Sequence, residues 1–158
     1  MFRKMRRFKQ ELTKEECIEV LKNEPRGILS VIGEDGYPYG MPMNYWYNEK
    51  DGKIYFHGAK AGHKIDAIKN CDKVSFCVCD KGYRKEGEWA LNIRSVIIFG
   101  TIKVVDDEDK KVEICSNLCR KFTDDEDYLK HELVHSGPAV MCLELEVEHM
   151  TGKLVNES

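Results

Sequence analysis

Residues 55–70 read Tyr-Phe-His-Gly-Ala-Lys-Ala-Gly-His-Lys-Ile-Asp-Ala-Ile-Lys-Asn. Ile54 to His57 is a short run of β-formers and predicts a strand. Gly58 to Gly62 is a loop of small residues bounded by glycine. The apolar spacing of Ile65 and Ile68 then predicts a helix over 63–70. The stretch therefore places a loop of small residues directly between a strand and the start of a helix.

Such a helix start suits an anion. Its first backbone N–H groups have no partners within the helix, and small residues let a phosphate approach the backbone. Lys60, His63 and Lys64 add donors that carry or can carry positive charge. The pattern predicts an anion site, and an ordinary turn with a solvated basic helix face remains an equally open interpretation.

The rest of the chain is mainly β with peripheral helices. The patterns predict six strands and three further helices, and strands joined by hairpins favour a small, closed or partly closed antiparallel barrel. The expected strands cover 27–32, 39–47, 54–57, 74–79, 95–105 and 139–148, and the helices 13–23, 107–122 and 124–135. We expect a single domain over 1–158, with a basic N-terminal arm at 1–11 and a C-terminal tail at 151–158.

Composition narrows the classes of partner. The net charge of −3 and the pI near 6.0 argue against a nucleic-acid-binding surface, because the only basic cluster lies in the arm. No apolar run is long enough to span a membrane, and no signal-peptide pattern follows the basic start. We therefore expect a cytoplasmic protein with no membrane contact, whose seven cysteines are reduced thiols.

The stretch Met41-Pro42-Met43-Asn44-Tyr45-Trp46-Tyr47 is unusual for a strand. Proline removes a backbone donor, so the strand is expected at an edge or a bulge, where its backbone could face a ligand. Methionine and aromatic side chains would then wall a flat ring, with Asn44 at a polar edge. Packing of alternate residues in the core is the competing interpretation and is expected for at least half of them.

The cysteines give no metal site of common spacing. Cys77 and Cys79 share one face of a strand, and neither this pair nor Cys115 with Cys119 has the spacing of structural zinc pairs. Buried thiols are the preferred explanation. A cysteine-based metal or redox sensor remains an alternative.

Several motifs, taken in order, resemble one family. They are Gly27-Ile28-Leu29-Ser30-Val31 before a Gly-Tyr-Pro turn, Pro42-Met43-Asn44-Tyr45, Ile54-Tyr55-Phe56-His57-Gly58-Ala59, Gly62-His63-Lys64-Ile65-Asp66-Ala67-Ile68, Ser95-Val96-x-x-Phe99-Gly100 and Thr151-Gly152-Lys153. Over nearly the whole chain this order is similar to the pyridoxamine-phosphate-oxidase-related FMN-binding split barrels, and within them to the nitroimidazole-resistance branch.

The resemblance implies a six-stranded split barrel that forms a homodimer, with FMN in the clefts between two chains. It places the phosphate on 57–64 with Lys64 as its main cationic partner, and the ring along 42–45. Trp89 and the tail from His149 to Lys153 would come from the second chain. The implied cofactor-binding residues are Pro42, Met43, Asn44, Tyr45, Phe56, His57, Gly58, Ala59, His63, Lys64, Trp89, Ser95 and Val96.

The resemblance also implies an FMN-dependent oxidoreductase that reduces a small acceptor, such as a nitro-aromatic, with NAD(P)H or another reductant as donor. His57 is the expected polar group near the substrate, because an imidazole changes charge near neutral pH. A non-catalytic flavin or haem carrier is the alternative, and some relatives use a deazaflavin. Lysine and histidine stand here where many relatives use arginine, which predicts modest phosphate affinity.

Overall fold

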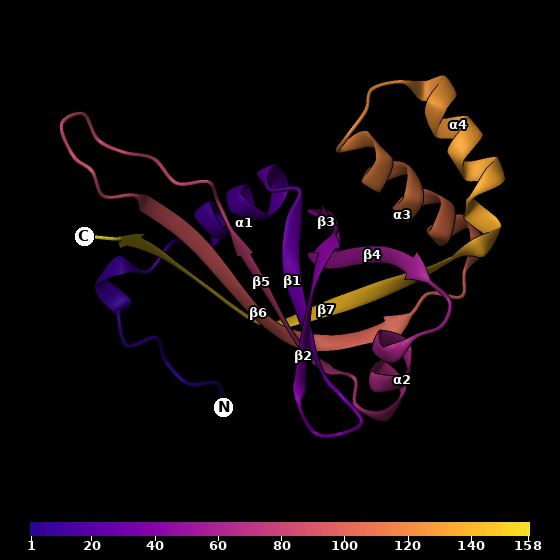
Figure 1. The fold of residues 1–158 in the computed structure, drawn as a ribbon, viewed down its shortest axis with the longest axis horizontal. Coiled ribbons are helices and arrows are strands. Elements are labelled where there is room, and N and C mark those ends of the chain that lie inside the picture. Colours follow the sequence, from indigo (N-terminus) through magenta and orange to yellow (C-terminus); the bar gives the residue numbers. More distant parts are fainter.

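The computed structural model describes residues 1–158 as one strongly curled antiparallel sheet with helices around it (Figure 1). The strands lie in the order β2-β1-β5-β6-β7-β4-β3. Their bounds are β1 Arg26–Ile32, β2 Pro38–Asn44, β3 Trp46–Asn48, β4 Lys53–Ala59, β5 Lys73–Cys79, β6 Asn92–Val104 and β7 Val140–Asn156. The fold is thus the expected mainly β split barrel, with seven strands instead of six.

The extra strand arises at Tyr45. The chain pairs with β1 up to Asn44, and from Trp46 onwards it pairs with β4 instead. Tyr45 is therefore the corner at which one continuous segment passes from one edge of the sheet to the other. Its side chain is fully buried, and the Lys121 ammonium donates 2.8 Å hydrogen bonds to the carbonyl oxygens of Tyr45 and Glu24. The barrel is closed at this corner by the chain itself.

The final strand is longer than expected. It pairs with β6 as far as Asn156, so the predicted tail at 151–158 is wrong for most of its length. The alternating pattern predicts a strand that ends at Glu148, before the Thr151-Gly152-Lys153 motif. Gly152 instead allows close packing, because a Cβ atom there would lie 2.5 Å from the Cys17 Sγ atom.

The helices follow the predictions closely. They are α1 Lys14–Asn23, α2 His63–Asn70, α3 Glu108–Arg120 and α4 Glu126–His135, with single 3₁₀ turns at Phe8–Gln10 and Gly137–Ala139. The capping box of α1 is confirmed: the Thr13 Oγ1 atom accepts from the Glu16 N–H at 3.2 Å, and the Glu16 carboxylate accepts from the Thr13 N–H at 2.8 Å. No helix has both the length and the apolar character needed to cross a membrane.

Two apolar clusters flank β4 and β7. The larger fills the barrel and includes Phe56, Leu143 and Leu145, whereas the smaller lies under α3 and includes Tyr55 and Cys142. The prediction of one mostly wet face on the final strand is therefore wrong at Cys142 and Glu144, which are both buried. Cys142 packs under α3, and Glu144 pairs with Lys53 and Lys103. β4 separates two differently packed regions of the protein.

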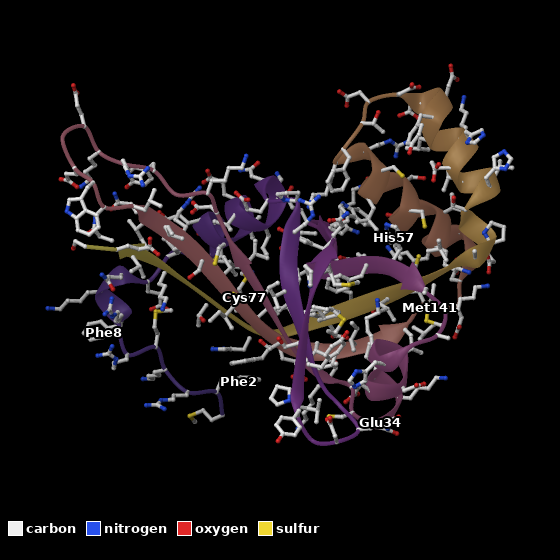
Figure 2. The ribbon with its side chains drawn as sticks, in the orientation of Figure 1. Phe2, Phe8, Glu34, His57, Cys77 and Met141 are labelled. Atoms are coloured by element: carbon white, nitrogen blue, oxygen red, sulfur yellow. The ribbon has the colours of Figure 1, made fainter.

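The N-terminal arm is only partly solvated. The Phe2 ring stacks on His149 at a centroid distance of 4.6 Å and on Phe99 at 5.9 Å, so the start of the arm lies on the sheet (Figure 2). The basic residues that follow in the arm are all exposed.

Candidate functional site

Alternate residues of β4 point to opposite sides of the sheet. We call the side of Ile54, Phe56 and Gly58 the inner face of β4, and the side of Tyr55 and His57 its outer face. The inner face belongs to the barrel interior, and the outer face lies against α3. Each face carries a different group of polar side chains.

Lys64 is the centre of the inner-face group. Its ammonium lies 3.7 Å from the Met43 sulfur, and a Cβ atom on Gly58 would be only 2.8 Å from it. No carboxylate pairs with Lys64. Burial lowers the pKa of Lys64, as expected for a cation partly removed from water without a counter-ion. An anion at this position would supply the missing charge.

The start of α2 adds backbone donors beside Lys64. The helix begins after Gly62, which has a φ of 130°, a backbone conformation that only glycine adopts at low cost. No side chain caps the first turn. Its first N–H groups therefore lack partners within the helix. His63 lies next to them and stacks on the Tyr39 ring at 4.3 Å. The loop and the uncapped helix start thus adjoin a lysine that has no carboxylate partner, and the anion site itself stays a prediction.

The aromatic wall expected at 41–47 is mostly part of the core. Tyr45 and Phe56 are fully buried, and Met41, Met43 and Tyr47 pack against the barrel cluster. Pro42 pairs with Ile28 and faces outward, and Asn44 is half-buried at the end of β2. Tyr45 is the only fully buried residue of this segment. Pro42 is exposed, and Met43 and Asn44 are half-buried, so these three positions differ in the surface that a ligand could contact.

His57 is not part of the Lys64 group. It lies on the outer face of β4, where it pairs with Cys142 of β7. There it lines a small cavity with Cys115 and Cys119 of α3. Figure 2 shows it on the side of the barrel where α3 lies. Partial removal from water lowers the pKa of His57, and the Lys64 charge lowers it further, so its imidazole is neutral at neutral pH. The sequence placed His57 and Lys64 in one loop but could not show on which side of the strand each lies.

The remaining predicted residues lie elsewhere. Val96 is fully buried in the barrel core, and Ser95 faces outward beside Cys79 and Lys153. Trp89 is 74% exposed in the loop between β5 and β6, which Figure 1 shows at the opposite end of the molecule from α2. Within one chain Trp89 therefore cannot reach Lys64.

One surface was not identified from the sequence. The outward sides of β1 and β6 expose Ile28, Ile32, Ile97 and Phe99, with exposed fractions of 45%, 44%, 37% and 41%. We call this surface the exposed sheet face. The signal was present as apolar residues at both alternating positions of these strands, which is typical of a sheet covered on both sides.

No group of three or more His, Cys, Asp or Glu side chains could hold a metal ion. All seven cysteines are free thiols, and the Sγ atoms of Cys115 and Cys142 lie 3.8 Å apart. Spacing along the sequence suggested Cys119 as the neighbour of Cys115. The sulfur in contact with Cys115 is that of Cys142, across the contact between α3 and β7.

Solved structures with the same fold were found. A candidate 5-nitroimidazole antibiotic resistance protein from Bacteroides thetaiotaomicron is 19% identical, with a TM-score of 0.76 over 92% of this chain and 87% of that one. An FAD-binding protein from Mesorhizobium loti is 21% identical, with a TM-score of 0.70 over 92% and 97%. An FAD- and haem-binding protein from Mycobacterium smegmatis is 21% identical, with a TM-score of 0.71 over 95% and 74%.

No curated protein sequence matches the chain. A family model does, over residues 13–154, and this range contains the Lys64 group, the Tyr45 corner and nearly all of the barrel. The chain therefore belongs to the pyridoxamine 5'-phosphate oxidase family.

Proposed function

We propose that this protein is an FMN-dependent oxidoreductase that reduces a small acceptor, such as a nitro-aromatic, with a nicotinamide as electron donor. The observation that carries the proposal is the half-buried Lys64 ammonium, which has no carboxylate partner and lies beside the uncapped start of α2. A terminal phosphate dianion would satisfy both features.

The flavin would supply the hydride and electron transfer, and the chain would supply binding and orientation. Lys64 and the first N–H groups of α2 would hold the phosphate. Met43 and Asn44 would contact the ring from the inner rim, while Tyr45 and Phe56 support them from the core. Because His57 is on the other face of β4, a proton-donating role for it requires the acceptor to approach from the α3 side.

We further propose that two copies associate through the exposed sheet face. Four large apolar side chains on one sheet surface are a common sign of a protein interface. In such a dimer Ser95 and Pro42 would lie near the interface, and Trp89 of the second copy could approach the flavin, which it cannot do within one chain. The seven free thiols agree with a reducing compartment such as the cytoplasm.

The choice of electron acceptor rests on family membership and on the similarity to the candidate 5-nitroimidazole resistance protein. Two other neighbours are named for FAD, and one of these also for haem. FAD is therefore the main competitor for the site, and a non-catalytic flavin or haem carrier is the competing function.

The test is a titration of the full-length protein with FMN, FAD and riboflavin, followed by fluorescence. Lys64→Ala should weaken FMN binding by about 10- to 100-fold, because one charge-assisted hydrogen bond contributes about 1.5–3 kcal/mol. Riboflavin lacks the phosphate, so its affinity should not change. Lys69→Ala is the matched control, since Lys69 is exposed on the same helix.

Equal FMN affinities for the Lys64→Ala and Lys69→Ala variants would rule out the phosphate site. If the protein binds FMN tightly but does not catalyse the oxidation of NADH or NADPH by a nitro-aromatic acceptor, the result would favour a non-catalytic flavin carrier. Sedimentation of the FMN-bound protein as a monomer would remove the interface proposal while leaving the phosphate site intact.

A further inference from the structure

Cys115 and Cys142 form a thiol pair across the contact between α3 and β7. Their Sγ atoms are 3.8 Å apart, and a disulfide requires about 2.05 Å. Side-chain rotation and a small shift of α3 would close this gap. Cys119 is one turn away from Cys115 on the same helix, where Cβ atoms are about 5–6 Å apart, too far for an unstrained disulfide.

The pair is accessible from one side. Cys115 is half-buried and lines a cavity of about 390 Å³ between α3 and α4, together with Lys60, Glu108, Lys111, Val112, Leu133, Gly137 and Pro138. Cys142 is fully buried behind it. A small oxidant in the cavity therefore meets Cys115 first. The cavity does not include Lys64, Met43 or Gly58.

The surroundings distinguish the two thiols. The hydrogen bond with Cys142 and the Lys111 charge together lower the pKa of Cys115 to about 7, against the opposing effect of burial. The same hydrogen bond and burial raise the pKa of Cys142. Cys115 thus has thiolate character at neutral pH, while Cys142 keeps its proton. His57 of β4 pairs with Cys142 of β7, and it lines a small cavity together with Cys115.

We propose that Cys115 and Cys142 are an oxidisable dithiol, in which Cys115 reacts with a peroxide and Cys142 resolves the product to a disulfide. The Cys115 thiolate attacks the peroxide, the O–O bond breaks, and a sulfenic acid forms on Cys115. The leaving hydroxide or alkoxide takes a proton from solvent and departs as water or an alcohol. The Cys142 sulfur then attacks the Cys115 sulfur. The S–S bond forms, the S–O bond breaks, and the hydroxyl leaves as water with the Cys142 proton. Two thiols are oxidised and one peroxide is reduced.

The disulfide would connect α3 to β7 and enclose α4 within the covalent loop. Because α4 and the turn at Gly137–Ala139 form one wall of the cavity, oxidation would fix that wall relative to the barrel. The site needs no flavin, so this inference stands independently of the proposed function.

The test exposes the full-length, reduced protein to hydrogen peroxide under native conditions, then alkylates the remaining thiols and maps peptides without reduction. We expect the loss of two of the seven thiols, one cross-linked peptide pair containing Cys115 and Cys142, and full reversal by dithiothreitol. Before oxidation, Cys115 should react with iodoacetamide at least about tenfold faster than Cys77, whose pKa burial raises.

Variants separate the two roles. Cys142→Ser should abolish the disulfide and leave a sulfenic acid on Cys115 that dimedone traps. Cys119→Ser is the matched control on the same helix and should still lose two thiols. A disulfide between any other pair, no disulfide in the wild-type protein, or an unchanged product in Cys142→Ser would overturn the proposal. The wild-type mapping needs no substitution and is unaffected by any folding defect of the variants.

Discussion

The two faces of β4 differ more than the sequence of that strand suggests. Phe56 and Gly58 face the barrel, where the Lys64 ammonium has no counter-ion. Tyr55 and His57 face α3, where two thiols are in contact. A strand of seven residues thus separates the Lys64 group from the thiol pair. Proximity in sequence, as between His57 and Lys64, did not mean a shared site.

The largest difference between the faces is expected in folding stability. Phe56→Ala removes a fully buried ring from the barrel core and should lower the free energy of unfolding by about 3–5 kcal/mol. His57→Ala removes an exposed ring and should cost less than about 1 kcal/mol. Urea denaturation of both variants measures this. Similar losses would show that the outer face supports the fold as much as the inner face does.

Gly58→Ala tests whether the inner face positions Lys64. The new methyl group would occupy the space of the ammonium, which must move away. We expect FMN affinity to fall by about tenfold, which corresponds to about 1.4 kcal/mol, with little change in stability because a lysine end is easily displaced. Gly137→Ala is the matched control, because a Cβ atom there would meet no other atom within 4 Å and Gly137 does not have a positive φ. An unchanged affinity in Gly58→Ala would contradict this geometry.

Tyr55→Phe tests the polar contacts of the outer face. The Tyr55 hydroxyl donates to the Asp51 carboxylate, and the Lys110 ammonium lies 4.7 Å from the centre of its ring. Loss of the hydroxyl should cost about 1 kcal/mol in unfolding experiments, while FMN binding stays unchanged. A weakened FMN affinity would mean that the two faces are coupled.

Glu144→Gln should give the smallest effect, and the pH dependence of stability is where it should be seen. Burial alone would raise the pKa of Glu144, but the hydrogen bond from Lys53 at 2.8 Å and the charges of Lys53 and Lys103 hold it below its ordinary value of 4.5. A depressed pKa in the folded state means that the stabilisation is present above pH 4.5 and is lost as the pH falls through the folded-state value. The difference in melting temperature between pH 7 and pH 3 should be smaller in the variant than in the wild-type protein. If the change between pH 7 and pH 3 is equal in the variant and the wild-type protein, the ion pair of Glu144 with Lys53 does not contribute to stability.

The parts of the fold that the sequence predicted are those determined locally. The capping box at Thr13 and the strand–loop–helix around Gly62 depend on neighbouring residues, and both appear as expected. The parts it missed depend on distant contacts. The corner at Tyr45 depends on a change of strand partner, and the burial of Cys142 depends on α3. Gly152 is explained by its close approach to Cys17 of α1 and to Leu12. For the site, residue types predicted an anion loop, but the side of β4 on which His57 lies came from the pairing with Cys142.

Lys121 also sets a limit on the order of folding. The two carbonyl groups that it binds belong to residues 97 and 76 positions earlier in the chain. During synthesis the Tyr45 corner therefore stays without this partner until α3 has left the ribosome. Contacts of such long sequence separation are associated with slow folding. The barrel is expected to close late, and the uncovered β2 and β3 edges would then be the segments most exposed to misassociation.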